Sequence, residues 1–380
     1  MINSAILKAA LFCPSPEYAW GLPILIRSKP GCGKTALVKL LAQQMGLPYL
    51  RLSPAERGEG YFGCVPVPGT DGHLHYPAPA DVVKTFVDRG LLFLDEIDKA
   101  APALQAPLLG CVQLRQLGAH TFPVGVRIIG ACNDVDAGGW DLTTPLANRF
   151  GHFEYDGMDP QDWTSALLGS FRPQSTEAPL NPALLEEQVR AAWPEADAYA
   201  RGLVAGFITR RPNLLHTEPV KGAKHLAWPS RRTVEYAAIA LASSRVHGLS
   251  ERDTDEFMAG FVGQSWVAEF RTWTEMADLP APADVLDGKE TFKHDSRRLD
   301  RTLAVLGACA ALVIPAACPH RKERTEAFWR LVAPVIKDAP DLAVGAGRAV
   351  MKNGLILTGE SPQTKALQAL LPILTAAGMR

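Results

Sequence analysis

One short segment near the start of the chain has the composition of a phosphate-binding loop. It reads Ser28-Lys29-Pro30-Gly31-Cys32-Gly33-Lys34-Thr35 and lies between an apolar stretch and a helical pattern. Glycines allow backbone N–H groups to turn inward around phosphate oxygens, and the start of a helix adds partial positive charge. Lys34 can reach the β- and γ-phosphates of ATP, and the Thr35 hydroxyl can ligate Mg²⁺. The residues expected to hold the nucleotide are Pro30, Gly31, Cys32, Gly33, Lys34, Thr35 and Ala36.

The loop departs from the usual pattern at its first position. The pattern GxxxxGK[ST] begins with glycine, whereas this chain has Ser28. That position mainly shapes the turn, so we expect phosphate binding to survive the change. An ordinary glycine-rich turn between a strand and a helix is the alternative interpretation, and the sequence Gly33-Lys34-Thr35 in this context makes it the weaker one.

Two carboxylates directly follow a strongly apolar run. Leu91–Leu94 predicts a buried strand, and Asp95 and Glu96 come immediately after it. Ligands of open parallel sheets bind at the carboxyl ends of the strands, so Asp95 can hold Mg²⁺ through water and Glu96 can polarise the attacking water. Asp98 is expected to be a surface or capping residue. Alone, such acids are equally consistent with the start of a solvated helix, but downstream of the phosphate loop they indicate nucleotide hydrolysis.

These residues need a scaffold that brings the ends of several strands together. The first half of the chain alternates strand patterns with helix patterns, namely strands over Pro23–Arg27, Tyr49–Leu52, Leu91–Leu94 and Val126–Ala131 and helices over Thr35–Met45, Ala80–Arg89 and Pro102–Gln113. This alternation predicts a parallel sheet covered by helices on both faces. Ser53–Pro79 is rich in glycine and proline and is expected to be a loop. After Gly157 the patterns are helical, with a strong helix over Trp228–Arg245.

In this order the motifs resemble those of the AAA+ superfamily, and within it the MoxR-type ATPases, over roughly Leu22–Ala242. The strand at Val126–Ala131 is similar to the one that carries sensor 1, which implies that Asn133 lies near the γ-phosphate and the attacking water. Leu142–Phe150 is similar to the segment that carries the arginine finger. The resemblance implies that Arg149 enters the site of the neighbouring subunit and stabilises charge on the γ-phosphoryl group. By position alone, Arg149 would be interpreted as a surface arginine after a helix, and a strand-end asparagine in a turn is the alternative interpretation of Asn133.

The last motif of the resemblance is Trp228–Thr233. Ser230 is a good N-cap for the helix that follows it. The resemblance assigns sensor 2 to Arg232, two residues after that serine, and implies that Arg232 contacts the phosphates from the helical lid. Arg231 is the competing assignment. Two solvated arginines in the first turn of a helix would oppose the helix dipole, and a bound phosphate would remove that objection.

Two insertions also fit the resemblance. Tyr61–Tyr76 contains Pro-Gly and Asp-Gly turn signals and lies where MoxR-type proteins carry a hairpin inserted into helix 2. Leu114–Val124 lies where a hairpin before sensor 1 is expected. Loops in these positions often face a central pore. Tyr61 and Phe62 are therefore candidates for gripping a substrate, with packing in the core as an equal alternative.

The resemblance implies an α/β fold with three parts. These are a P-loop NTPase parallel sheet, the AAA+ core, over residues 1–155, an α-helical lid with sensor 2 over 156–247 and an additional helical region over 248–380. ATP and Mg²⁺ are the implied cofactors, and hydrolysis is expected in a ring of subunits, a hexamer. The implied work is remodelling or activation of a protein client, with a von Willebrand factor A-domain protein as partner. Two alternatives stay open: a nucleic-acid-linked AAA+ motor, and a slow nucleotide-gated scaffold in a stress or defence system.

Composition and charge bound these interpretations. The 380 residues suit two or three packed units, and 47% hydrophobic with 21% charged residues indicates a globular chain. A net charge of -1 without a basic tail makes nucleic-acid binding the less favoured function. Seven scattered cysteines without zinc spacing, and no recognisable signal peptide, lead us to expect a cytoplasmic protein with reduced thiols. The apolar run Thr302–Cys318 is short for a membrane span and contains Gly307 and Pro315, so a buried helix is expected.

Overall fold

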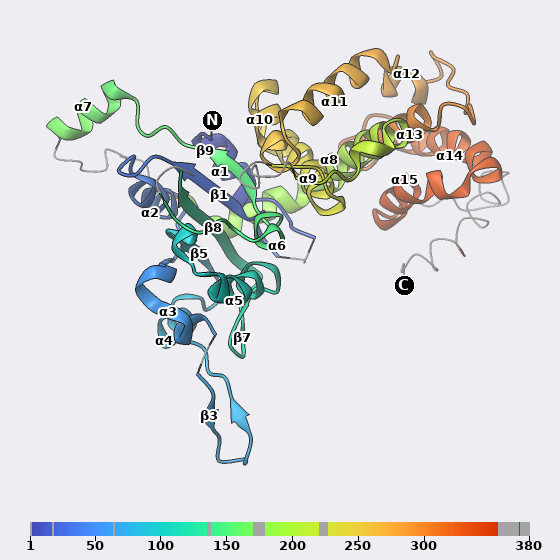
Figure 1. The fold of residues 1–380 in the computed structure, drawn as a ribbon. Helices are drawn as coiled ribbons and strands as arrows, with labels where there is room; N and C mark the ends of the chain where they lie inside the picture. The colour runs from blue at the N-terminus through green and yellow to red at the C-terminus, as the bar shows by residue number, and fades with distance from the viewer. Residues whose placement is uncertain are drawn as a thin grey trace. The chain divides into compact units, whose positions relative to one another are not determined.

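The computed structural model describes residues 2–16, 19–63, 65–134, 138–169, 179–219 and 227–355, together with Pro372. Packing divides the chain into two compact units, whose ribbons are drawn in Figure 1. The first unit comprises Met1–Val189, Glu218–Tyr236 and Leu249–Gly263, and the second comprises Arg190–Thr217, Ala237–Gly248 and Gln264–Arg380. The domain boundaries expected near residues 155 and 247 stay predictions.

The first unit is built around one parallel sheet. Its strands are β1 (Ile24–Ser28), β2 (Tyr49–Leu52), β5 (Arg89–Leu94), β8 (Gly125–Asn133) and β9 (Gly151–Glu154). They lie in the order β2-β5-β8-β1-β9, and every neighbouring pair is parallel, which confirms the predicted fold class. Because β8 lies between β1 and β5 and all three strands are parallel, their C-terminal ends meet on the same side of the sheet.

Burial explains which strands the sequence pattern predicts. In β5 every residue after Arg89 is buried, and β8 is buried up to Asn133. Strands covered on both faces need near-continuous apolar runs, which β5 has over Leu91–Leu94 and β8 has apart from Arg127. The pattern does not predict β9, which is short and alternates polar with apolar residues. Phe153 of β9 packs on Phe257 and Phe261 of α10 (Glu251–Val262), with ring centroids 6.3 and 6.0 Å apart.

Helices surround the sheet of the first unit. Besides α10 they are α1 (Ser4–Leu11), α2 (Lys34–Gln44), α3 (Pro54–Phe62), α4 (Ala80–Thr85), the 3-10 turn η1 (Ile97–Lys99), α5 (Pro102–Gln113) and α6 (Thr144–Ala147). A further helix, α7 (Pro160–Leu168), has no buried residue. Helix α1, which no pattern in the sequence predicts, begins where the Asn3 side chain accepts the Ile6 N–H. Side chains from strands and helices meet in one core that includes Phe86, Leu92 and Leu108.

Two small hairpins lie where the sequence predicts insertions. β3 (Val67–Pro68) pairs with β4 (Leu74–His75), and β6 (Gln116–Leu117) pairs with β7 (His120–Thr121). Figure 1 shows the β3–β4 hairpin projecting away from α3 and α4. We call residues 65–76 the β3–β4 arm. Its exposed apolar side chains, 47 to 64% accessible, are those of Val65, Val67, Leu74 and Tyr76.

The prediction of a loop over Ser53–Pro79 is wrong in its first part. Residues Pro54–Phe62 form α3, which is interrupted at Gly58, where φ is 67°. Phe62 is only 3% exposed and packs in the core, which gives this segment a reason to be helical despite its glycines. The contact supports the core-packing alternative for Phe62.

Tyr61 and the end of α4 also differ from the simplest expectations. Tyr61 is half-buried, and its hydroxyl donates a hydrogen bond to Asp81 at 2.7 Å, which ties α3 to α4. The predicted helix over Ala80–Arg89 is too long, because α4 ends at Thr85 and Arg89 already belongs to β5.

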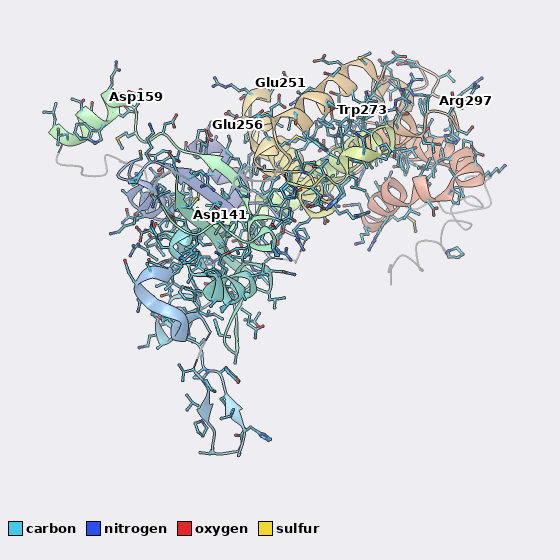
Figure 2. All side chains as sticks on the ribbon, in the orientation of Figure 1. Asp141, Asp159, Glu251, Glu256, Trp273 and Arg297 are labelled. Carbon is cyan, nitrogen blue, oxygen red and sulfur yellow. The ribbon has the colours of Figure 1, made fainter. Side chains whose placement is uncertain are left out.

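The second unit is helical, as expected for the C-terminal half of the chain. It takes most of α8 (Pro182–Arg210) and α9 (Arg231–His247), and contains α11 (Gln264–Met276), α12 (Pro282–Leu286), α13 (Leu299–Val313), α14 (Arg321–Asp338) and α15 (Pro340–Lys352). Gly202 and Gly307 let α8 and α13 approach closely, since a Cβ on Gly202 would lie 2.7 Å from the Gly307 Cα. Trp273, labelled in Figure 2, donates its indole N–H to Asp300 at 3.3 Å.

The apolar run predicted as a buried helix lies largely within α13, whose residues are mostly buried. Among the described residues, no helix has both the length and the apolar composition that crossing a bilayer would require.

A buried ion pair fixes the start of α8 to the sheet in the first unit. The Arg127 side chain is fully buried in β8 and donates to the Glu186 carboxylate and to the Leu11 carbonyl. Its guanidinium also lies over the rings of Phe12 and Trp20, 4.7 and 5.6 Å from their centroids. Burial lowers the pKa of Arg127, and the Glu186 carboxylate opposes that shift.

We predict that Glu186→Ala lowers the free energy of unfolding by about 3 kcal/mol, because it leaves the Arg127 charge buried without its carboxylate. Denaturant unfolding followed by circular dichroism would measure the change. Glu187→Ala is the matched control, since Glu187 is the adjacent but exposed acid of the same helix. Equal stability of the two variants would contradict the prediction.

Candidate nucleotide site

The predicted phosphate loop joins β1 to α2. Gly31 and Gly33 adopt φ values of 80° and 88°, which side chains other than glycine rarely allow. A Cβ at either position would meet no atom within 4 Å, so the backbone angle is what requires glycine. Gly33 is the N-cap of α2 and offers no side-chain acceptor, so the first N–H groups of the helix are left for a ligand. Pro30 lies in the exposed turn and Ala36 in the exposed first turn of α2.

Lys34 is buried and has partners within the protein. Its ammonium group donates to the Ser28 hydroxyl at 2.8 Å and to the Ser28 carbonyl at 3.2 Å. It also donates to Asn133 Oδ1 at 3.0 Å. The structure therefore brings together the ends of β1 and β8, as the sequence predicts. Ser28 replaces the usual glycine without closing the loop, because its hydroxyl becomes an acceptor for Lys34.

Thr35 and Asp95, the two oxygen ligands expected from the sequence, lie within hydrogen-bond distance of one another. The Thr35 hydroxyl donates to Asp95 Oδ2 at 2.9 Å, and Asp95 is 3% exposed. No group of three or more His, Cys, Asp or Glu side chains in the described ranges could hold a metal alone. Mg²⁺ commonly uses one or two protein oxygens together with nucleotide phosphates and water, so this hydroxyl and carboxylate fit it.

Glu96 occupies an unusual backbone conformation at the end of β5. Its φ and ψ are 54° and 43°, in the left-handed region that costs a non-glycine residue about 1–2 kcal/mol. Its N–H donates to Asp95 Oδ1 at 3.1 Å. No hydrogen bond or ion pair to its half-buried carboxylate is found among the described residues. Strained backbone at a strand end is common in functional sites, and this one turns a free carboxylate out of the strand.

Asn133 is held by two groups that the sequence analysis did not assign to the site. Its N–H donates to Asp98 Oδ1 at 3.3 Å, and its carbonyl accepts from Arg27 at 3.1 Å. Asp98 is 8% exposed, so the expectation of a surface or capping residue is wrong. The position of Asp98, three residues after Asp95 in the turn that leaves β5, brings it to the end of the neighbouring strand β8.

Arg149 lies in the turn between α6 and β9. Its guanidinium donates to Gln113 Oε1 from Nε at 3.1 Å and to the Pro145 carbonyl from Nη1 at 2.9 Å. Burial lowers the pKa of Arg149, and the charge of Arg232 lowers it further. The two arginines are therefore close enough to repel one another.

Asn148 connects Arg149's turn to the start of α9. The Asn148 Oδ1 atom accepts from the Ser230 hydroxyl at 3.1 Å and from Arg232 Nη1 at 3.4 Å. Ser230 also accepts the Thr233 N–H at 3.2 Å, which confirms it as the N-cap. Arg231 is exposed, whereas Arg232 is half-buried and turned to Asn148. Of the two competing assignments, Arg232 is the one that shares a site with Arg149.

The two arginines and the phosphate loop lie at opposite ends of the parallel strands. β9 runs parallel to β1, with Gly151 beside Ile24 and Glu154 beside Arg27. Arg149 precedes the first residue of β9, whereas the phosphate loop follows the last residue of β1. The strand from Ile24 to Ser28 is about 13 Å long at the usual rise per residue. The structure thus joins Lys34, Thr35, Asp95 and Asn133, and it keeps Arg149 and Arg232 apart from them.

Arg51 is a further site residue that the sequence analysis missed. It lies in β2, and its Nε donates to Asp95 Oδ2 at 2.7 Å. This hydrogen bond raises the pKa of Arg51 above its already high ordinary value. No local motif marks Arg51, because the contact depends on the pairing of β2 with β5.

Comparison with known proteins agrees with this geometry. Residues 24–155 match the family described as ATPase family associated with various cellular activities (AAA). The match spans the whole sheet from β1 to β9, so this part of the chain is an AAA-type ATPase domain and the chain is an ATP hydrolase. No curated protein matches the chain. A crystal structure described as that of a putative ATPase from Cytophaga hutchinsonii matches with 12% identity and a TM-score of 0.46, over 68% of this chain and 78% of that chain.

We predict that Asp98→Ala slows ATP hydrolysis about tenfold, because a displaced Asn133 would orient the reacting groups poorly. The dissociation constant of ADP should change little, since Asp98 does not touch the phosphate loop. Steady-state hydrolysis and nucleotide titration would measure the two effects. Asp98→Asn keeps an oxygen acceptor for the Asn133 N–H and should retain most of the activity. Full turnover of Asp98→Ala would rule out this positioning role.

Proposed function

We propose that the chain is a MoxR-type AAA+ ATPase that hydrolyses ATP with Mg²⁺ between neighbouring subunits of a ring, a hexamer. The observation that carries the proposal is that Arg149 and Arg232 lie at the N-terminal ends of the parallel strands, whereas Lys34 lies at their C-terminal ends. Neither arginine is placed to serve the phosphates of its own subunit. A neighbouring subunit that presents its two arginines to the phosphate loop would complete the site.

Each residue of the site then has a defined task. Lys34 and the N–H groups of the loop bind the β- and γ-phosphates, and Asn133 orients the γ-phosphate and the water. Thr35 and Asp95 would hold Mg²⁺, which neutralises phosphate charge. The Glu96 carboxylate accepts a hydrogen bond from the attacking water and polarises it. Arg149 and Arg232 of the neighbouring subunit stabilise charge developing on the γ-phosphoryl group.

Assembly would also relieve a cost that the isolated subunit carries. Arg149 and Arg232 are like charges within interaction range of one another, and no carboxylate hydrogen-bonds to either of them among the described residues. An anion placed between such a pair favours both charged forms. The γ-phosphate of the next subunit is the anion that this proposal supplies.

Remodelling of a protein client is the work we propose for the hydrolysis cycle. The β3–β4 arm projects from the ATPase domain and carries exposed apolar side chains, which are typical of a surface that contacts another protein. By resemblance to MoxR-type proteins, a von Willebrand factor A-domain protein would be the partner. The helical lid over 156–247 would transmit nucleotide state to the arm, with 248–380 as an added helical region. Six free thiols among the described residues support a reducing, cytoplasmic setting.

We predict that Glu96→Gln binds ATP but hydrolyses it about 10²–10⁴-fold more slowly, the usual contribution of a positioned general base. The amide keeps the size of the side chain but cannot accept the proton of the attacking water. Nucleotide titration and phosphate release would measure binding and turnover separately. Near-normal turnover would contradict the role of Glu96.

We predict that mixing subunits restores activity only across the interface. Arg149→Ala and Lys34→Ala should each be inactive alone, and a mixture should recover part of the activity, because one subunit supplies the arginine and the other the phosphate site. Arg232→Ala mixed with Lys34→Ala should behave in the same way. Recovery with Arg149→Ala but not with Arg232→Ala, in rings shown to contain both subunits, would mean that Arg232 serves its own subunit.

A further inference from the structure

The carboxylate that would face magnesium already holds a cation. Arg51 Nε lies 2.7 Å from Asp95 Oδ2, and the Thr35 hydroxyl donates to the same oxygen at 2.9 Å. The Asp95 side chain is only 5% exposed, so water screens the contact weakly. The guanidinium of Arg51 therefore occupies the carboxylate oxygen nearest to the hydroxyl that would ligate the metal.

The sheet forces this contact. β2 and β5 are parallel neighbours, with Leu52 beside Leu94, and the Asp95 N–H donates to the Leu52 carbonyl at 2.9 Å. The Arg51 backbone is thus anchored next to Asp95 by main-chain pairing, and only its side chain can move. While the guanidinium contacts Asp95, a divalent cation near this carboxylate would meet its positive charge, which opposes entry of the cation.

A second carboxylate offers Arg51 another partner. Arg51 Nη1 donates to Glu56 Oε1 at 2.9 Å and to Oε2 at 3.1 Å. Glu56 lies in the first turn of α3, the helix that leads into the β3–β4 arm. The Glu56 side chain is 56% exposed, so it can follow the guanidinium outward, whereas buried Asp95 cannot.

We propose that Arg51 is a positioning residue that competes with Mg²⁺ for Asp95, and that Glu56 draws Arg51 off this carboxylate when the metal enters. The division of Arg51 between Asp95 and Glu56 then sets the Mg²⁺ concentration that the nucleotide site requires. Because Glu56 lies on α3, the helix that leads into the β3–β4 arm, a partner bound to the arm can shift that division. The inference rests on the proposed Mg²⁺-dependent nucleotide site.

The test is the Mg²⁺ dependence of nucleotide binding by the full chain, without turnover. A fluorescent, non-hydrolysable ATP analogue is titrated in EDTA and at increasing Mg²⁺ concentrations. Arg51→Gln should reach half of the Mg²⁺ effect at about tenfold lower Mg²⁺, a change of about 1.4 kcal/mol, because it removes the competing charge. Glu56→Gln should need severalfold more Mg²⁺, because Arg51 then has only Asp95. Binding in EDTA should stay the same in both variants.

Three further variants separate competition from a general structural effect. Arg57→Gln is the matched control, since Arg57 lies on the same helix but pairs with Asp81 at 3.3 Å, and it should leave the Mg²⁺ requirement unchanged. Arg51→Lys keeps the charge and should return the requirement towards that of the wild type. The double variant Arg51→Gln with Glu56→Gln should behave like Arg51→Gln alone, because Glu56 acts only through Arg51.

Two results would overturn the proposal, and they differ from failure of the site itself. One is an identical Mg²⁺ dependence of Arg51→Gln and the wild type, with binding in EDTA intact. The other is an equal shift in Arg57→Gln. If the wild type binds the analogue neither in EDTA nor with Mg²⁺, the nucleotide site is absent and the proposed function fails first.

Discussion

The insertion of β8 between β1 and β5 is the constraint on which the site depends. Parallel strands end at the same edge, so the loop after β1, the carboxylates after β5 and Asn133 at the end of β8 must converge. Because β9 is parallel to the other strands, its start, and Arg149 before it, lie at the opposite ends of the strands. One arrangement of main-chain hydrogen bonds therefore gathers the groups that bind phosphate and separates them from the arginines that would complete the reaction.

Among the described residues of the nucleotide site, Lys34 and Asp95 have internal partners, whereas no partner of the Glu96 carboxylate is found. Lys34 donates to Ser28 and Asn133, and Asp95 accepts from Thr35 and Arg51. A buried charge without a partner costs several kcal/mol, so these contacts keep the fold stable before any ligand arrives. Binding of nucleotide and metal is then an exchange of partners rather than a simple addition, and the strength of each internal contact sets part of the affinity.

The sequence predicts those parts of the site that are local, and it misses those that depend on register. Lys34, Thr35, Asp95 and Glu96 stand in short motifs whose spacing relative to a strand or helix start is visible in the chain. Arg51 contacts Asp95 and Asp98 contacts Asn133, but they do so only because β2 pairs with β5 and the turn after β5 packs on β8. β9 escaped prediction for a related reason, since its stability comes from the rings of α10, about a hundred residues away in the chain.

The placement of the arginines and the phosphate loop at opposite ends of the strands also bears on how hydrolysis would be coupled to movement in the proposed ring. Arg149 is held by Gln113 and by the Pro145 carbonyl, and Asn148 joins its turn to Arg232, so hydrogen bonds connect both arginines to the same turn before β9. A connected pair of this kind could report the presence of phosphate through a change in how whole subunits pack. Since the β3–β4 arm belongs to the same compact unit, a change in packing between subunits would displace the arms together with the arginines. Movement of the arm would then be coupled to hydrolysis through the sheet as well as through the helical lid proposed to transmit nucleotide state.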